Sequence, residues 1–341
     1  MNWKLHIALA LCCGLSGCSL VRAQERPGAL SEVGQTKVEE ALKAGDTTRA
    51  IIVDERERTF LIHVPPKYDK SKPTPLVVAY HGLGLPASMM PSYTKLDETA
   101  DKYGFIVVYP AGITLSWNAG ARRGPLAEAR ADDVKFTREM VKDLEKVLNI
   151  DKRRVFATGM SNGGMLCYKL ANEASDLFAA IAPVSGTMTY SEITSKRPVP
   201  VIHFHGTDDG VVGYDQKREM LGGLVYVASA PDTIAAWVKF DGCKSKPIET
   251  DLPDKESDGT TVTKRDYGTG RDGVEVVLYT IKGGGHTWPG VTPPAKNLSD
   301  RFLGLATFDI SANELMWEFF AKHPMPEAEK AAEKVPGARD L

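Results

Sequence analysis

The sequence is poor in cysteine and has no run of lysine or arginine, no internal repeat and no low-complexity tract. Only Cys167 and Cys243 lie in the body of the chain, and no Cys/His spacing is typical of a metal site, so we expect no metal and no organic cofactor. The two thiols could form a disulfide, or Cys167 could be a buried free thiol, and the sequence leaves both interpretations open. The formal net charge of −2, without a basic stripe, gives no indication of nucleic-acid binding.

The sequence also lacks an apolar stretch long enough to span a bilayer comfortably. Its first segment, residues 1–23, has a lysine followed by a short apolar stretch rich in small residues, which is typical of an export signal. Within it, Leu15–Cys18 (LSGC) is similar to a bacterial lipobox, whose cysteine is acylated; the alternative is ordinary cleavage after Ala23. We therefore expect an exported protein, either a cell-envelope lipoprotein or a secreted or periplasmic protein. It would contact a membrane only through a lipid anchor at Cys18.

The composition of the chain is that of a globular protein, with 43% hydrophobic and 25% charged residues among 341. After a polar spacer (24–47), residues 48–323 alternate unbroken apolar runs with amphipathic stretches, and 324–341 form a charged tail. Such runs are typical of strands buried on both faces, so we expect an α/β fold with a mostly parallel sheet and helices on both faces. The expected strands are 49–53, 59–64, 75–82, 103–112, 154–159, 178–184, 199–206 and 274–284, and the expected helices 92–103, 131–150, 163–174, 231–242 and 309–323.

The strand expected over 154–159 runs directly into Gly159-Met160-Ser161-Asn162-Gly163. This G-x-S-x-G spacing between a strand and a helix is typical of a nucleophile elbow, whose sharp turn lifts the serine hydroxyl clear of the sheet. Glycine is needed on both sides because a Cβ would collide with a neighbouring strand or helix. An ordinary tight turn is the alternative interpretation. Ser161 is thus a candidate nucleophile, provided that the chain also supplies a base and an acid.

A serine nucleophile needs a histidine base that a carboxylate orients, in the chain order Ser, Asp or Glu, His. His286 lies in a glycine-rich loop directly after the last expected strand and is the candidate base. Asp208 and Asp209 both follow the strand expected over 199–206, and their spacing does not choose between them. The other histidines are set aside by their positions: His6 in the export signal, His63, His81, His203 and His205 before or within strands, and His323 near the end of the last helix, where we expect it at the surface.

An oxyanion in such a site needs two backbone N–H donors. Asn162, as the residue after the serine, supplies the first. Leu83, in the loop after an early buried strand, is the expected second donor. We expect His81 to pack in support of that loop.

Seven sequence blocks, in order, carry a resemblance to a known family: LVVAYHGLG, YPAGITLSWNAG, ADDVKFTREMVKDL, RVFATGMSNGGML, LFAAIAPVSG, HFHGTDDGVVGY and GGGHTWPG. From about residue 48 to 321 the chain resembles the secreted esterases that include poly(3-hydroxybutyrate) depolymerases and feruloyl or acetyl-xylan esterases, which have an α/β-hydrolase fold. The resemblance implies Asp209, the second residue after His-Gly-Thr, as the acid. It also implies that Trp117, Asn118 and Trp288 lie near the acyl pocket, with a purely structural role as the alternative for both tryptophans.

These features predict an exported serine carboxylesterase that works through an acyl-enzyme and resembles polyhydroxybutyrate depolymerases, acting on hydroxyalkanoate oligomers or polymer. The first alternative is a feruloyl or acetyl-xylan esterase acting on plant polysaccharide esters. A serine peptidase of the prolyl-oligopeptidase kind shares the elbow but usually has a propeller, and no blade repeat occurs in this sequence. A non-catalytic cell-surface binding protein on a hydrolase scaffold is the alternative of another class, although a binder has no need of an intact triad. The only expected partner is a small or oligomeric ester.

Overall fold

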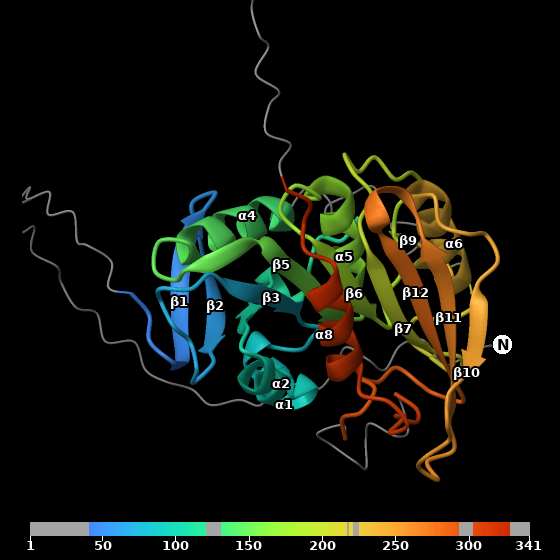
Figure 1. Ribbon diagram of the computed structural model, residues 1–341. Helices are drawn as coiled ribbons and strands as arrows, with labels where there is room; N and C mark the ends of the chain where they lie inside the picture. The colour runs from blue at the N-terminus through green and yellow to red at the C-terminus, as the bar shows by residue number, and fades with distance from the viewer. Residues whose placement is uncertain (1–40, 121–130, 217, 221–224, 293–302, 328–341) are drawn as a thin grey trace, which may run out of the picture. The chain divides into compact units, whose positions relative to one another are not determined.

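A ten-stranded sheet is the centre of the fold. Figure 1 shows the computed structural model, which describes residues 41–120, 131–216, 218–220, 225–292 and 303–327. These residues fall in one compact unit, Glu39–Leu341. The expected export signal with Cys18, most of the spacer and most of the charged tail lie outside the described residues.

The strand order of the sheet is β1-β2-β4-β3-β5-β6-β7-β12-β11-β10. Neighbours from β4 through β12 in this order are parallel, whereas antiparallel pairs flank them at both edges. A separate two-stranded ribbon joins β8 to β9. The strands are β1 Gly45–Val53, β2 Arg56–Val64, β3 Thr74–Tyr80, β4 Ile106–Pro110, β5 Ile150–Met160, β6 Ala180–Val184, β7 Val201–Gly206, β8 Arg218–Met220, β9 Val225–Val227, β10 Ile248–Asp251, β11 Thr261–Thr269 and β12 Glu275–Lys282.

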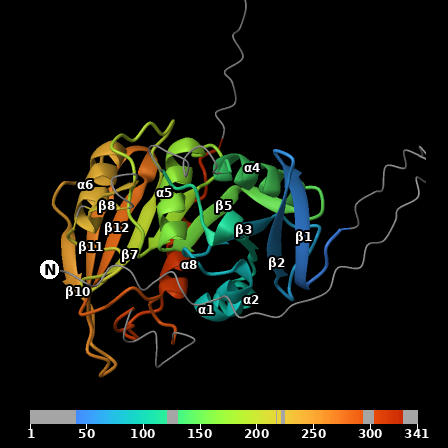
Figure 2. The same cartoon turned by 180° about the vertical axis from the view of Figure 1, so that it is seen from behind.

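The helices cover both faces of this sheet. In Figure 1, α8 lies across one face, and the reverse view in Figure 2 shows α4, α5 and α6 across the other. Alternate residues of each central strand enter the two cores. Leu76 and Val78 of β3 join the core with α4, α5 and α6, while Val77 and Ala79 join the core with α1, α2 and α8. The helices are α1 Met90–Thr94, α2 Leu96–Tyr103, α4 Asp133–Leu144, α5 Asn162–Glu173, α6 Ala230–Asp241 and α8 Ala312–Lys322, with 3₁₀ turns η1 Ala87–Met89, η2 Ile113–Leu115 and η3 Arg271–Gly273.

This architecture confirms the predicted α/β fold, and the differences concentrate at the edges of the sheet. β1 begins at Gly45, inside the expected spacer, and only Asp54 and Glu55, both with positive φ, make the turn to β2. Strands β10 and β11 were not expected from the sequence. They are edge strands with mostly exposed or half-buried residues, so they lack the unbroken apolar run that marked the central strands.

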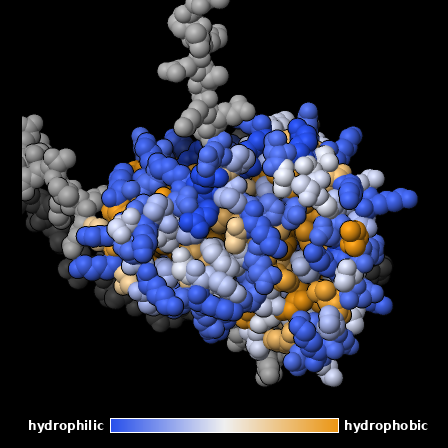
Figure 3. Space-filling view, viewed as in Figure 1, coloured by the Kyte–Doolittle hydropathy of each residue, from blue (hydrophilic) through white to orange (hydrophobic). Residues whose placement is uncertain are grey.

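Figure 3 shows a mostly hydrophilic face on which hydrophobic residues gather toward one side. None of the helices among the described residues is long and apolar enough to cross a membrane. Cys167 is buried and Cys243 half-buried, and both thiols are free.

Candidate active site

Ser161 occupies a strained corner between a central strand and a helix. It follows the last residue of β5 and directly precedes Asn162, the first residue of α5, with φ 56° and ψ −117°. A non-glycine residue in this region costs about 1–3 kcal/mol, and such strain persists mainly where the surrounding structure enforces it. Two backbone hydrogen bonds enforce it here: Ser161 N–H donates to the Val184 carbonyl at 2.8 Å, and Met165 N–H donates to the Ser161 carbonyl at 2.9 Å.

Three glycines permit this corner because they sit against backbone atoms. A Cβ on Gly159 would lie 2.7 Å from the Tyr80 carbonyl oxygen, and one on Gly163 would collide with the same oxygen. A Cβ on Gly186, which the sequence did not single out, would collide with the Ser161 carbonyl oxygen. Strands β3, β5 and β6 therefore approach the elbow more closely than any side chain allows, as the G-x-S-x-G pattern predicted for the first two glycines.

The acid and the base meet above the carboxyl end of β7 and β12. His286 Nδ1 lies 2.7 Å from Asp209 Oδ2, and both residues are buried. Asp208 is exposed and accepts a hydrogen bond from the Thr207 hydroxyl instead. The structure thus brings Asp209, and not Asp208, to the histidine. Because a carboxylate can only accept here, His286 Nδ1 donates, and its Nε2 is free to accept a proton.

The carboxylate of Asp209 is held by several donors. Its Oδ1 accepts from the backbone N–H groups of Val211 at 2.9 Å and Val212 at 2.8 Å, and His205 Nε2 lies 3.4 Å from Oδ2. Burial opposes ionisation, but the hydrogen bonds from His205 and His286 outweigh it and hold the pKa of Asp209 well below its usual range. The acid is therefore charged at neutral pH and can stabilise a positive imidazole.

Ser161 and His286 line one cavity of about 350 Å³. Among the described residues, no hydrogen bond joins the Ser161 hydroxyl to the His286 imidazole, and such loose geometry is common before a substrate is bound. The cavity is lined mainly by apolar or small residues, and His286 and Tyr93 carry the only ionisable side chains among its described lining. The lining residues are Gly82, Leu83, Leu85, Tyr93, Ser116, Ala119, Gly120, Met160, Ser161, Asn162, Met165, Thr189, Val211, Val212, His286 and Leu303.

Both expected oxyanion donors lie at this cavity. The backbone N–H groups of Leu83 and Asn162 make no hydrogen bond to any described residue, and both residues line the cavity. Asn162 is the first residue of α5, where N–H groups are left unpaired by the helix and carry partial positive charge. Both N–H groups are thus unpaired among the described residues, as an oxyanion hole requires.

The loop that carries Leu83 is fixed from behind by His81 and Trp117. His81 Nδ1 donates to the Gly82 carbonyl at 2.8 Å, and its Nε2 accepts from Gly112 N–H at 2.9 Å. Burial lowers the pKa of His81, consistent with this neutral form. The Trp117 indole N–H donates to the His81 carbonyl at 2.9 Å. His81 therefore has the supporting position that the sequence predicted.

The three residues expected near the acyl pocket, Trp117, Asn118 and Trp288, have supporting positions. Trp117 and Trp288 are buried and are not among the lining residues; the Trp288 indole donates to Asn313 Oδ1 at 2.9 Å. The Asn118 backbone N–H donates to Asp133 Oδ2 at 2.6 Å. None of the three is among the described lining residues, and their N–H groups hold neighbouring segments, as in the structural alternative for the two tryptophans. The cavity is lined by residues next to Trp117 and Asn118 in the same loop, namely Ser116, Ala119 and Gly120.

Several site residues carried no recognisable signal in the sequence. Tyr93 on α1, Thr189 and Leu303 come from segments far apart in the chain and reach the cavity only through the fold. The Asn162 side chain holds Trp117 by accepting from its backbone N–H at 2.7 Å and donating to its carbonyl at 3.3 Å. Burial and the charge of Asp209 raise the pKa of Tyr93 to about 12, so its phenol is neutral.

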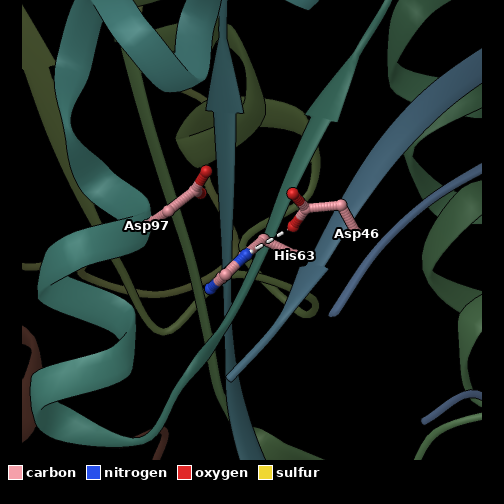
Figure 4. A group of neighbouring side chains, drawn as sticks. All are labelled: Asp46, His63 and Asp97. Carbon is pink, nitrogen blue, oxygen red and sulfur yellow. Dashed lines mark hydrogen bonds and ion pairs between the residues drawn. The ribbon is translucent and has the colours of Figure 1, made fainter. Parts of the chain in front are cut away.

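A group of potential metal ligands lies outside the cavity. Figure 4 shows Asp46 of β1, His63 of β2 and Asp97 of α2, whose ligand atoms all lie within 4.8 Å of one another. Both nitrogens of His63 are already hydrogen bonded, Nδ1 to Asp46 at 2.6 Å and Nε2 to Asp101 at 2.9 Å. Burial lowers the pKa of His63, but the hydrogen bonds to these carboxylates outweigh it and raise the pKa overall. Ion pairing of a histidine with two carboxylates accounts for this group.

Comparisons with known proteins find similar esterases. A family model described as esterase PHB depolymerase matches residues 59–216. A Nocardia uniformis subsp. tsuyamanensis protein assigned as an esterase, NocK, is 29% identical over 83% of this chain and 88% of its own length. Feruloyl esterase B of Piromyces equi is 29% identical over 67% of this chain, which spans only 42% of that protein. The resemblance to this esterase family is thereby confirmed.

The solved structures show the fold. Acetyl xylan esterase from Aspergillus awamori superposes with a TM-score of 0.52 at 17% identity, covering 76% of this chain and 99% of that one. Its similarity supports the α/β-hydrolase fold. The sequence matches indicate a carboxylic ester hydrolase.

Proposed function

We propose that this carboxylic ester hydrolase is a serine esterase with Ser161 as nucleophile, His286 as base and Asp209 as acid. The observation that carries the proposal is the 2.7 Å bond between His286 Nδ1 and Asp209 Oδ2 beside a serine in a strained corner. His286 Nε2 takes the Ser161 proton as Oγ attacks the ester carbonyl, and Asp209 stabilises the imidazolium. The oxyanion is held by the N–H groups of Leu83 and Asn162. The alcohol leaves with the proton from His286, and water activated by His286 then releases the acid.

Two substrate classes fit this site. Hydroxyalkanoate oligomers are favoured by the description of the matching family model, and feruloyl or acetyl esters by the names of the relatives. In both classes the acyl group is uncharged, which suits a cavity whose described lining is mainly apolar. Tyr93, a neutral phenol whose hydroxyl makes no hydrogen bond among the described residues, can donate to an oxygen on either acyl group.

A panel of esters tests the proposal. Wild-type protein and Ser161→Ala are assayed on p-nitrophenyl acetate, methyl ferulate, acetylated xylan and hydroxybutyrate oligomers. We expect the wild type to hydrolyse at least one of them and Ser161→Ala to lose about 10⁴-fold or more in kcat. Equal rates for the two proteins would refute the serine mechanism, and would favour the non-catalytic alternative if both rates were negligible. The preferred natural ester names the substrate class.

We also propose that the protein is exported and carries a lipid at Cys18, on the sequence evidence of residues 1–23. Radiolabelled palmitate should label the wild type and not Cys18→Ser. On cell fractionation, the wild-type protein should be found in the membrane fraction and the variant in the soluble fraction. Absence of label in the wild type would leave cleavage after Ala23 as the better account.

A further inference from the structure

A chain of buried hydrogen bonds leads from the helix that follows the nucleophile to the loop that carries the acid. The Tyr168 hydroxyl lies 2.9 Å from His203 Nδ1, and His203 Nε2 lies 3.0 Å from His205 Nδ1. His205 Nε2 lies 2.8 Å from the Val212 carbonyl oxygen and 3.4 Å from Asp209 Oδ2. Tyr168, His203 and His205 are each 0% exposed. Nothing in the reaction itself uses these three side chains.

The end of this series of hydrogen bonds at the Val212 carbonyl determines the direction of each bond. A carbonyl oxygen can only accept, so His205 Nε2 carries a hydrogen and donates to Val212. In neutral His205 the Nδ1 then accepts from His203 Nε2–H, and His203 Nδ1 accepts from the Tyr168 hydroxyl. Burial and the neighbouring His205 hold the pKa of His203 well below its usual range, in keeping with a neutral imidazole. Every polar atom of the two imidazoles thus has a partner.

The two ends of this series of hydrogen bonds lie in different parts of the site, one on the helix after Ser161 and the other in the loop of Asp209. Tyr168 lies on α5, the helix that begins directly after Ser161, whereas Val212 belongs to the loop of Asp209. Hydrogen bonds hold this loop through two of its N–H groups and through one carbonyl group. Asp209 Oδ1 accepts from the Val211 and Val212 N–H groups, and His205 donates to the Val212 carbonyl. Val211 and Val212 also line the cavity.

We propose that His205, supported by His203 and Tyr168, is a positioning residue that fixes the acid loop so that Asp209 meets His286 in register with Ser161. The inference rests on the proposed serine mechanism. Its physical basis is the low tolerance of the triad for displacement, because a shift of about 1 Å lowers the rate by about 100-fold. Without the donor at position 205, the Val212 carbonyl is left unpaired in a dry site and the loop is free to turn away.

Two substitutions of His205 separate positioning from packing. His205→Leu keeps much of the volume but removes the donor, whereas the amide nitrogen of His205→Gln can take the place of Nε2 and donate to Val212. On p-nitrophenyl acetate, we expect kcat of His205→Leu to fall about 10- to 100-fold with less than about a threefold change in KM. His205→Gln should stay within about threefold of the wild type. A matched control is His323→Leu, which removes another buried histidine, one that bonds the Phe319 carbonyl on α8.

A spectroscopic readout reports the geometry directly. The proton between His286 Nδ1 and Asp209 should give a low-field NMR resonance in the wild type, in His205→Gln and in His323→Leu, and the resonance should weaken or broaden in His205→Leu. Thermal unfolding shows whether each variant is folded. A folded His205→Leu with wild-type kcat and an intact resonance overturns the proposal.

A second variant keeps the test decisive if His205→Leu does not fold. Tyr168→Phe removes only the hydroxyl at the other end of the chain, and we expect kcat to fall about two- to tenfold, the equivalent of one hydrogen bond. Tyr190→Phe, whose hydroxyl donates to the Tyr168 carbonyl at 2.8 Å, is its control and should keep wild-type kcat. Wild-type kcat in Tyr168→Phe would then overturn the proposal. Inactivity of the wild type itself would refute the proposed function instead, so the two failures are distinguishable.

Discussion

The two ends of β7 each have a buried aspartate, and the two aspartates are in opposite states. Asp209, beyond the carboxyl end of β7, has donors on both oxygens and a pKa well below its usual range. Asp241, the last residue of α6, accepts one bond near the start of β7, from Val199 N–H at 3.1 Å. Its Oδ2 has no partner among the described residues. Burial raises the pKa of Asp241 to about 8, against the smaller opposing effects of Val199, Arg271 and Arg197.

The comparison shows that burial alone does not keep a carboxylate charged. Removal from water favours the neutral acid, and only hydrogen-bond donors and a cationic partner keep the charge. The chain supplies these donors at Asp209, which contacts His286, and supplies few at Asp241, which lies outside the candidate site. The following substitutions test the contrast from both ends of the strand.

The largest effect is expected from Asp209→Asn, which keeps the shape of the side chain and removes its charge. We expect kcat to fall about 10⁴-fold, because the amide no longer selects the productive form of His286. The matched control is Asp208→Asn on the exposed neighbour, which should keep the wild-type rate. Steady-state rates on a p-nitrophenyl ester check both. Loss of turnover only in the Asp208 variant would show that the acid is misassigned.

At the other end of β7, Asp241→Asn should stabilise the protein. In the wild type the folded-state pKa lies above the value of about 3.9 in the unfolded chain, so stability falls as pH rises from about 4 to about 8. Asparagine removes this loss, and we expect a gain of about 3 kcal/mol in the free energy of unfolding at pH 8 and a much smaller gain at pH 4. Urea unfolding at both pH values measures it. A variant less stable than the wild type at pH 8 would contradict the neutral state of Asp241.

The smallest effect is the opposite pH dependence at Asp209. Its depressed pKa gives the wild type stability that is present above about pH 4 and is lost as pH falls through the folded-state value. Asp209→Asn should therefore be less stable than the wild type by about 2 kcal/mol at pH 7, and the difference should shrink below pH 4. Urea unfolding at the same series of pH values measures this difference in the free energy of unfolding. A difference that stays constant with pH would argue against an ionised Asp209.

The sequence predicted those parts of the site that short-range patterns determine. The elbow is local, since Gly159, Ser161 and Gly163 lie within one turn, and the central strands are unbroken apolar runs. His286 followed from its loop position. Choosing Asp209 over Asp208 needed the family resemblance, because neighbouring residues of a turn differ only in direction, and the fold sets that direction.

The rest of the site depends on contacts between distant segments. Trp117 and Trp288 were expected near the pocket or in a structural role, and the structure shows each indole N–H donating to another buried residue, His81 or Asn313. His323 was expected at the surface, yet it is buried and donates to the Phe319 carbonyl. The pairing of His203 with Tyr168 joins a strand to a helix and has no sequence signature.

The most direct test of the account is the mass of the acyl-enzyme. The protein is mixed with p-nitrophenyl acetate, quenched in acid within the first turnover, digested, and its peptides are weighed. We expect one added acetyl group on the peptide that contains Ser161, and none on the matching peptide of Ser161→Ala. Ester hydrolysis by the wild type with no adduct on that peptide, or at an equal rate in Ser161→Ala, would contradict it.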